Sequence, residues 1–255
     1  MKVIRFQGFS PQLFRFLSGL AENNNKPWFD QHRSEYEAGV LAPIKAFVAE
    51  LGPIIHMLNE DIETEPRVGR TISRISNDMR FHKNRPPYRP VIYVCFARRG
   101  EKWFCSPILY TGIYPHGVSI GFYPGGHSEL RTGPVQEAIQ KNLRTFQHYL
   151  DDRRIAKSYW ELSGAENGKV TKWPLPKAAR KWTKLDSFTV GEHFVPNDQV
   201  VSRREFLDVA QGIILDLYPL WLFAASERLQ SDLELYGENA KLLARPITRQ
   251  VERDP

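Results

Sequence analysis

Apolar residues in the first quarter of the chain recur every three or four positions, which is the spacing of one face of a helix. The first stripe consists of Leu13, Phe16, Leu17 and Leu20. Ser10-Pro11, directly before it, is typical of a helix start. A second stripe predicts a helix from about Pro27 to Leu58. Gly39 and Pro43 lie inside it and predict a kink or break, because both residue types weaken a helix interior.

Between residues 68 and 123 the period of the apolar positions changes to two. The run 91–96 predicts a buried strand, and turns are expected near residues 98–101 and 115–117. Alternation continues through residues 118–122. Consecutive strands joined by short turns predict an antiparallel sheet.

Helical spacing returns at residues 135–150 and again at 155–162. A capping box at Ser202–Glu205 predicts the start of a long helix. The expected fold class is therefore α+β. A central antiparallel sheet, from about residues 68–123 plus a late strand near 186–192, is packed by N-terminal, middle and C-terminal helices. We expect a single domain over residues 1–236 and a polar tail over 237–255.

The composition of the chain limits which class of protein it can be, but it says little about activity. Of the 255 residues 42% are hydrophobic and 25% charged, which is ordinary for a globular protein. Cys95 and Cys105 are the only cysteines, too few for a disulfide framework or a cysteine metal cage, so we expect a cytoplasmic protein. No apolar run approaches the length of a membrane span, so no membrane partner is expected. The familiar catalytic and nucleotide-binding motifs are missing, so we assign no catalytic residue, metal or cofactor.

The positive charge of the chain is concentrated in one segment. Residues 66–102 hold ten Lys and Arg residues and only two acidic residues, whereas the remainder of the chain holds more acidic than basic residues. A general basic coat would favour non-specific nucleic-acid binding, but a local concentration favours a site.

The basic segment contains the stronger candidate site, formed by Arg74, Asp78, Arg80, Lys83 and Tyr88. The planar guanidinium group of arginine suits phosphate or carboxylate, and Asp78 is placed to orient one guanidinium. The two prolines before Tyr88 stiffen the chain and position its ring. The competing interpretation is a solvated surface in which Asp78 is an ordinary salt-bridge partner.

A second candidate site lies at the start of the second helix and consists of Asn24, Lys26, Trp28 and His32. Amide groups and a lysine at a helix start can bind an anion with help from the helix dipole, and the aromatic rings can stack a base. The structural interpretation is a core stripe in which Trp28, His32 and Tyr36 share one helical face and the histidine is bonded internally.

Two parts of the sequence resemble the bacterial and fungal family DUF2461. The first carries Asn23-Asn24-Asn25-Lys26, Trp28-Phe29 and His32-Arg33, and the second runs from Arg74-Ile75 to Pro87-Tyr88. The resemblance extends from about Gly8 to Leu222. It implies a single α+β domain and no particular activity.

The leading hypothesis is a pocket for a small anionic ligand, phosphorylated or nucleotide-like. A nucleic-acid-binding module, with Trp28, Tyr88 or Trp103 stacking on bases, is a less favoured alternative. Two further alternatives are pairing of the arginines with an acidic protein partner and a purely structural network. The sequence leaves open whether the protein is an enzyme, its oligomeric state, and whether the two candidate sites border one cavity.

Overall fold

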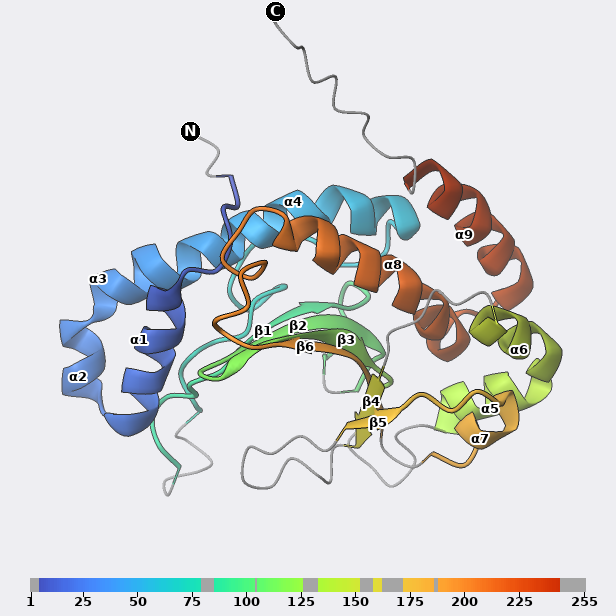
Figure 1. Ribbon diagram of the computed structural model, residues 1–255, viewed down its shortest axis with the longest axis horizontal. Helices are drawn as coiled ribbons and strands as arrows, with labels where there is room; N and C mark the ends of the chain where they lie inside the picture. Colours follow the sequence, from blue (N-terminus) through green and yellow to red (C-terminus); the bar gives the residue numbers. More distant parts are fainter. Residues whose placement is uncertain are drawn as a thin grey trace, which may run out of the picture.

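The computed structural model describes residues 5–78, 85–103, 105–125, 133–151, 158–161, 172–185 and 188–243. Its centre is a six-stranded sheet with the strand order β1-β2-β3-β6-β4-β5, in which every pairing is antiparallel. Helices α4 and α8 lie across one face of this sheet (Figure 1). The arrangement confirms the α+β fold class.

Three of the strands lie where the pattern predicts them: β1 (Ile92–Phe96), β3 (Gly117–Tyr123) and β6 (Phe188–Phe194). A fourth strand, β2 (Ile108–Tyr114), lies between the two expected turns and inside the region predicted to form the sheet. β2 and β3 form a hairpin in which Tyr114 pairs with Gly117, so the turn is Pro115-His116. Gly117 has a φ of 144°, a backbone conformation that side chains disfavour, which explains a glycine at this position.

The helix predicted over residues 155–162 is wrong in its described part. Ser158–Glu161 forms strand β4, which pairs with β6 on one side and with β5 (Lys172–Pro174) on the other. The apolar residues have helical spacing, but aromatic residues also favour strands. The unpaired edge of β6 supplies backbone partners that helical spacing does not reveal.

The N-terminal arm consists of α1 (Pro11–Glu22), α2 (Lys26–Gln31), α3 (Arg33–Glu35), the π-helical segment η1 (Tyr36–Leu41) and α4 (Ala42–Leu58). The expected break near Gly39 and Pro43 is present as η1, which contains Gly39, and as the start of α4, where Pro43 occupies the first turn. A π-turn shifts the helical register by accommodating an extra residue.

The remaining helices are α5 (Gly133–Lys141), α6 (Leu143–Asp151), α7 (Ala179–Trp182), α8 (Phe206–Ala225) and α9 (Leu229–Leu243). The predicted capping box is wrong, because α8 begins only at Phe206 and the Ser202 hydroxyl donates to the carbonyl of Gln199 at 3.2 Å. Residues 201–205 form turns instead. Helix α9 continues across the tail boundary predicted at residue 237.

The main core lies between the sheet and α4 and α8. Alternate strand residues such as Val94, Ile120 and Val190 are fully buried in it, as is Leu217 of α8. Arg204, just before α8, holds the N-terminal segment against this layer: its guanidinium lies 2.6 Å from the Glu50 carboxylate of α4 and donates to the carbonyl of Phe6 at 3.0 Å.

Two helical stretches, Arg33–Leu58 and Phe206–Ala225, are long and apolar enough to cross a membrane by length and composition alone. Within the most apolar 18 residues of each stretch, the buried share is nevertheless 44% and 67%, respectively. Since α8 contacts β2, β3 and β6, its apolar composition is equally that of a core helix.

Candidate functional site

The two candidate sites from the sequence contact each other. The carboxamide of Asn24 donates to the carbonyl oxygen of Tyr88 at 2.9 Å and accepts from the backbone N–H of Tyr88, also at 2.9 Å. The ring of Tyr88 stacks on Phe29 of α2, with 4.3 Å between centroids. The side chain of Asn24 thus pairs with the backbone of Tyr88 as a neighbouring strand would, and it fixes the basic segment against the N-terminal arm.

The basic segment itself forms an irregular hairpin beside β1, which we call the basic hairpin (described residues 71–78 and 85–91). Ser76 and Tyr88 form an antiparallel bridge, and the backbone N–H of Arg89 donates to the carbonyl of Ile75 at 2.7 Å. The Arg89 guanidinium donates to the carbonyl of Arg74 at 2.6 Å. Arg89 thus closes the hairpin through hydrogen bonds from both its backbone and its side chain.

The side chains of the basic hairpin differ in their surroundings. Arg74 and Arg85 are exposed, and among the described residues neither forms an ion pair. Arg70, just before the hairpin, lies 3.6 Å from the carboxylates of both Glu63 and Glu65. Arg80 and Lys83, the other two predicted cations, lie outside the described residues. Asp78 is exposed at the end of the described stretch.

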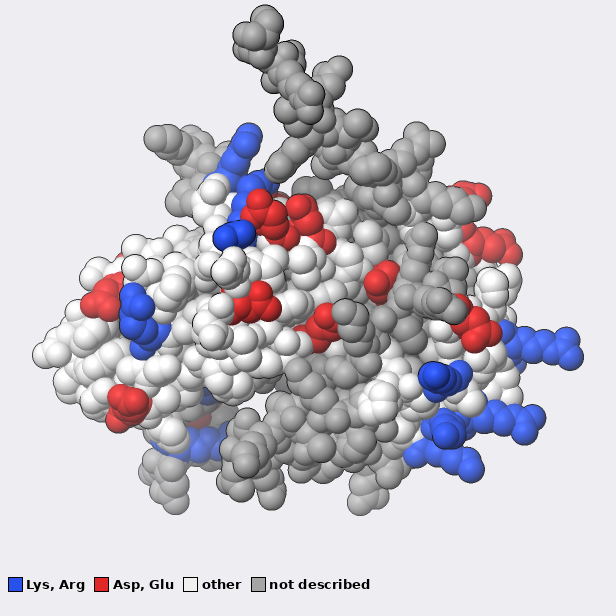
Figure 2. Space-filling view, in the orientation of Figure 1, with Lys and Arg blue, Asp and Glu red and all other residues white. Residues whose placement is uncertain are grey.

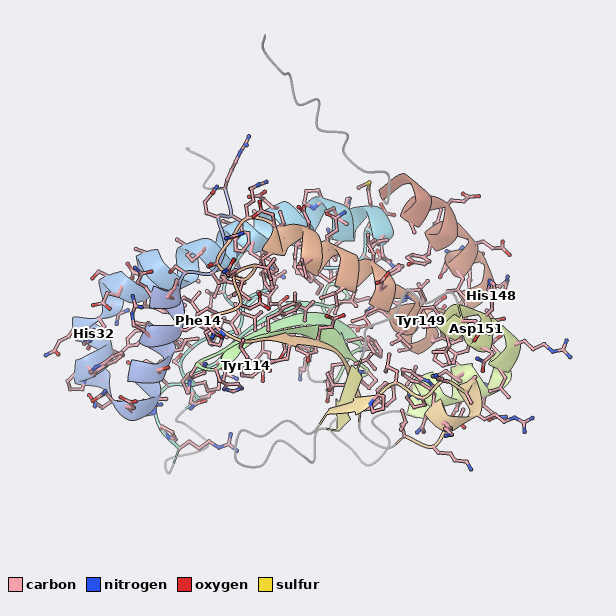
Figure 3. All side chains as sticks on the ribbon, in the orientation of Figure 1. Phe14, His32, Tyr114, His148, Tyr149 and Asp151 are labelled. Carbon is pink, nitrogen blue, oxygen red and sulfur yellow. The ribbon has the colours of Figure 1, made fainter. Side chains whose placement is uncertain are left out.

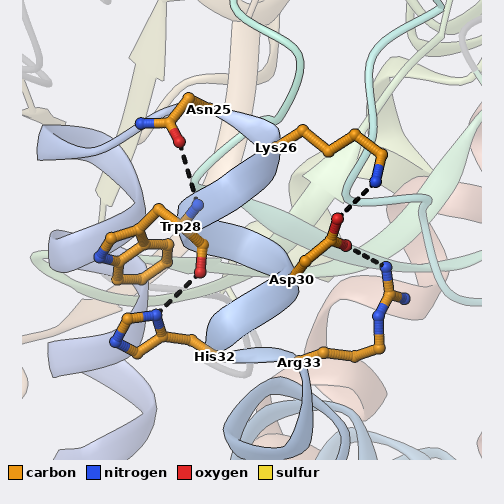
Figure 4. A network of polar contacts seen from close by, with 6 residues as sticks. All are labelled: Asn25, Lys26, Trp28, Asp30, His32 and Arg33. Carbon is orange, nitrogen blue, oxygen red and sulfur yellow. Dashed lines mark hydrogen bonds and ion pairs between the residues drawn. The ribbon is translucent and has the colours of Figure 1, made fainter.

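At the start of α2 most polar groups bind one another (Figure 4). The Asn25 carboxamide oxygen caps the helix by accepting from the backbone N–H of Trp28 at 3.0 Å. Asp30 forms ion pairs with Lys26 and, at 2.7 Å, with Arg33. The hydrogen bonds from Lys26 and Arg33 lower the pKa of Asp30. The exposed ammonium group of Lys26 is therefore already matched by one carboxylate.

Trp28 and His32 have the geometry of the structural interpretation. Their rings stack with 4.1 Å between centroids, and Nδ1 of His32 lies 2.8 Å from the carbonyl oxygen of Trp28. Trp28 also packs against Phe16 of α1 at 5.5 Å. Figure 3 places His32 at the outer end of the arm, well away from Tyr114 under the sheet.

The sheet has a second face, turned away from α4 and α8, and its polar residues were missed in the sequence. The side chains on this face, which we call the polar sheet face, alternate with the core residues of the same strands, and they include Tyr93, Cys95, Tyr110, Tyr114, Ser119 and His193. The same face also holds a small hydrophobic cluster around Cys95 and Tyr110, to which Ala97 and Ile108 belong. Figure 3 shows Tyr114 on this side of the sheet. In β1 and β2 these positions were hidden because the strands also bury apolar residues on the opposite face, so each of the two reads as one continuous apolar run.

Glycines make room for the tyrosine rings on the polar sheet face. A Cβ atom on Gly121 would lie 3.0 Å from the ring of Tyr110, and one on Gly112 would lie 2.6 Å from the hydroxyl of Tyr114. The rings therefore lie against the strand backbone. Glycine inside a strand often marks such a close approach, and it was the one signal in the sequence that pointed to this face.

Polar groups follow one another across the polar sheet face. The hydroxyls of Tyr114 and Tyr93 are 3.4 Å apart, and the Tyr114 ring stacks on His116 at 5.3 Å. The ring of His116 lies 5.7 Å from that of His193, whose Nδ1 is 2.9 Å from the Ser119 hydroxyl. The face thus carries hydroxyl and imidazole groups from four strands and one turn.

Burial keeps these hydroxyl and thiol groups protonated. It raises the pKa of Tyr93, Tyr114 and Cys95, so at neutral pH the tyrosines are hydrogen-bond donors and the thiol is not a nucleophile. The positive charge of Arg89 opposes the shift at both Tyr93 and Cys95. The basic hairpin itself adjoins β1, where the Ser73 hydroxyl accepts from the backbone N–H of Tyr93 at 2.9 Å.

The chemistry that this arrangement supports is recognition of an acceptor-rich, negatively charged group by guanidinium, hydroxyl and imidazole donors. Within the described part of the chain, no group of three His, Cys, Asp or Glu residues is placed to hold a metal ion.

Comparison with known proteins agrees with the resemblance noted in the sequence. Residues 12–223 match the family described as "Conserved hypothetical protein (DUF2461)". No curated protein matches the chain. Because the match covers most of the sequence, the chain belongs to the DUF2461 family.

Proposed function

We propose that this DUF2461 protein binds a small anionic ligand, phosphorylated or nucleotide-like, where the basic hairpin borders the polar sheet face. The observation that carries the proposal is the contact between Asn24 and Tyr88, which unites the two sequence motifs and holds the hairpin against the N-terminal arm. Arg74 binds the anion, and Arg80 and Lys83 are assigned to the same role from their positions in the motif.

The charge balance supports an anion. Arg74 and Arg85 have exposed guanidinium groups without a carboxylate partner in the described ranges, and such groups form strong bidentate hydrogen bonds with phosphate or carboxylate. On the polar sheet face, Tyr93 and Tyr114 carry hydroxyl groups that burial keeps protonated. Such donors complement phosphate oxygens, which only accept hydrogen bonds at neutral pH.

The N-terminal residues have supporting roles in this proposal. Both polar atoms of the Asn24 side chain are bonded to Tyr88, so Asn24 positions that residue. Trp28 and His32 pack the arm on which α2 lies. Lys26 contributes to the positive potential, although Asp30 offsets part of it.

The test is thermal unfolding of the purified protein with inorganic phosphate, nucleotides and sugar phosphates as separate probes. A ligand that binds only the native state at about 100 times its Kd stabilises it by about 2.7 kcal/mol. For a chain of this size that corresponds to a rise in Tm of about 5–11 °C. We expect one class of anion to give this shift, and Arg74→Ala to abolish it.

Arg15→Ala is the matched control, because Arg15 is an exposed arginine on α1. It should leave the shift intact. An equal shift in a folded Arg74→Ala protein would overturn the proposal, as would the absence of any shift with all anions. An Arg74→Ala protein that does not fold would favour the structural-network alternative.

A cytoplasmic location is part of the same proposal. Cys95 and Cys105 are both free, and Cys105 is exposed. An exposed thiol persists in a reducing compartment and is readily oxidised elsewhere.

A further inference from the structure

The segment 177–184 presents four cations to solvent, because two of its other residues point inward. Ala179 and Trp182 of α7 are buried, and the Trp182 ring packs edge-on against Phe146 at 5.4 Å. With these two positions facing the core, the four basic residues between and beside them face outward: Lys177, Arg180, Lys181 and Lys184.

Side-chain amides fix this segment to α5 and α6 at both ends. Gln147 of α6 donates to the carbonyl of Lys177 at 3.0 Å and accepts from the backbone N–H of Ala179 at 2.9 Å. Gln136 of α5 donates to the carbonyl of Leu185 at 2.5 Å. The cations are therefore carried on a backbone that is held in place.

Two more exposed cations, Lys141 and Arg144, lie on the same group of helices, which we call the α5–α7 surface. Residues 133–151 and 174–185 together hold six Lys and Arg residues and two acidic residues, Glu137 and Asp151. Among the described residues, Lys141 is the only one of these six cations that forms an ion pair, at 3.9 Å from Glu137 with both side chains largely exposed. Figure 2 shows basic side chains gathered over α5, α6 and α7 and reaching into solvent.

An acidic protein and a nucleic acid would both match this charge, but their interfaces differ in apolar character. Protein interfaces depend on buried aromatic and aliphatic anchors at their centre. The large hydrophobic side chains exposed in the described structure are Met57, Val195 and Leu235, and all three lie on other elements. Binding to a phosphate backbone needs only cations on a polar surface.

We propose that the α5–α7 surface binds the phosphate backbone of a nucleic acid without reading its sequence. The site is separate from the basic hairpin and does not rest on the proposed function. Phosphate contacts of this kind release counterions, so the affinity falls steeply with salt.

The experiment is fluorescence anisotropy with a labelled DNA duplex of about 20 base pairs, titrated at several salt concentrations from about 50 to about 200 mM. The test variant is Lys177→Gln/Arg180→Gln/Lys181→Gln/Lys184→Gln. Each lost phosphate contact lowers the slope of log K against log salt by about 0.9, so the variant should lose up to about 3.6. We expect the affinity at low salt to fall by at least about tenfold.

Two controls make the outcome specific. Arg5→Gln/Arg15→Gln/Lys45→Gln/Arg228→Gln removes the same charge from exposed positions elsewhere and should keep most of the slope. Lys177→Arg/Lys181→Arg/Lys184→Arg keeps the charge and should keep the binding.

Three outcomes would overturn the proposal. The first is no duplex binding by the unaltered protein at about 50 mM salt. The second is equal loss in the test variant and in the charge-matched control. The third is competition by poly-glutamate as effective as that by DNA of equal charge, which would identify an acidic protein as the partner.

Discussion

Replacing Asn24 should separate the basic hairpin from the N-terminal arm. Asn24→Ala removes two hydrogen bonds of 2.9 Å and leaves the backbone N–H and carbonyl of Tyr88 without their partner. A buried polar group left unpaired costs about 1–3 kcal/mol, and the site is only partly buried, so we expect the lower half of that range for each group. The total is about 2–4 kcal/mol, or about 4–16 °C in Tm.

The assay is chemical denaturation of Asn24→Ala beside Asn23→Ala and Asn24→Asp. Asn23 is the matched control, because its exposed side chain makes one 3.0 Å bond to the carbonyl of Gly19 within its own helix turn. Asn24→Asp retains an acceptor for the Tyr88 N–H but loses the donor, so by the same count its loss should be about half that of Asn24→Ala. A loss for Asn24→Ala no larger than that for Asn23→Ala would refute this view of the contact.

Three other expectations can be checked on the same protein. Gly121→Ala should destabilise the protein by about 1–3 kcal/mol in denaturant titrations, because its Cβ would lie 2.5 Å from a carbonyl oxygen of β6. Gly39→Ala is the control, since a Cβ there meets open space and should be tolerated. Equal effects of the two substitutions would contradict the packing described. A thiol reagent added to the folded protein should modify Cys105 rapidly, whereas Cys95 should react only after unfolding, because Cys95 is buried and its pKa is raised. Rapid modification of both cysteines in the folded protein would contradict this expectation. Burial opposes ionisation of Glu50, but its hydrogen bonds to Arg204 and to a backbone N–H lower its pKa below 4.5. The ionised Glu50 therefore stabilises the folded protein above pH 4.5, and this contribution is lost as the pH falls through the native pKa. The stability difference between the protein and Glu50→Gln should shrink over that interval, and a constant difference would argue against it.

The sequence predicted those features of the fold that depend on local periodicity. The helix beginning at Pro11 and the strands β1, β3 and β6 lie where apolar spacing placed them. β4 was missed because strand formation there depends on the free edge of β6, which is close in space but not in sequence. The capping box was misplaced because Ser202 bonds locally to Gln199 and the chain turns before the helix begins.

For the candidate site, residue type was more informative than residue position. The sequence identified Asn24 and Tyr88 as members of two motifs, but their contact joins residues 64 positions apart. Pairing of a side-chain amide with a backbone leaves no spacing pattern. The polar sheet face was missed for a different reason: Tyr93 and Tyr114 lie on strands whose other face is also buried, so tyrosine there reads as part of an apolar run.

The basic hairpin also affects how the sheet meets other protein molecules. A strand edge with free N–H and carbonyl groups is a template on which another chain can add, and this is a common route to aggregation. Residues 71–73 already bond to the outer side of β1, through Ser73 to Tyr93 and through Thr71 to Cys95. At the opposite end of the described sheet, β5 has only three residues and ends in Pro174, which lacks an N–H. Both margins are thus poor templates, and an alteration that detached the hairpin would open one of them to self-association.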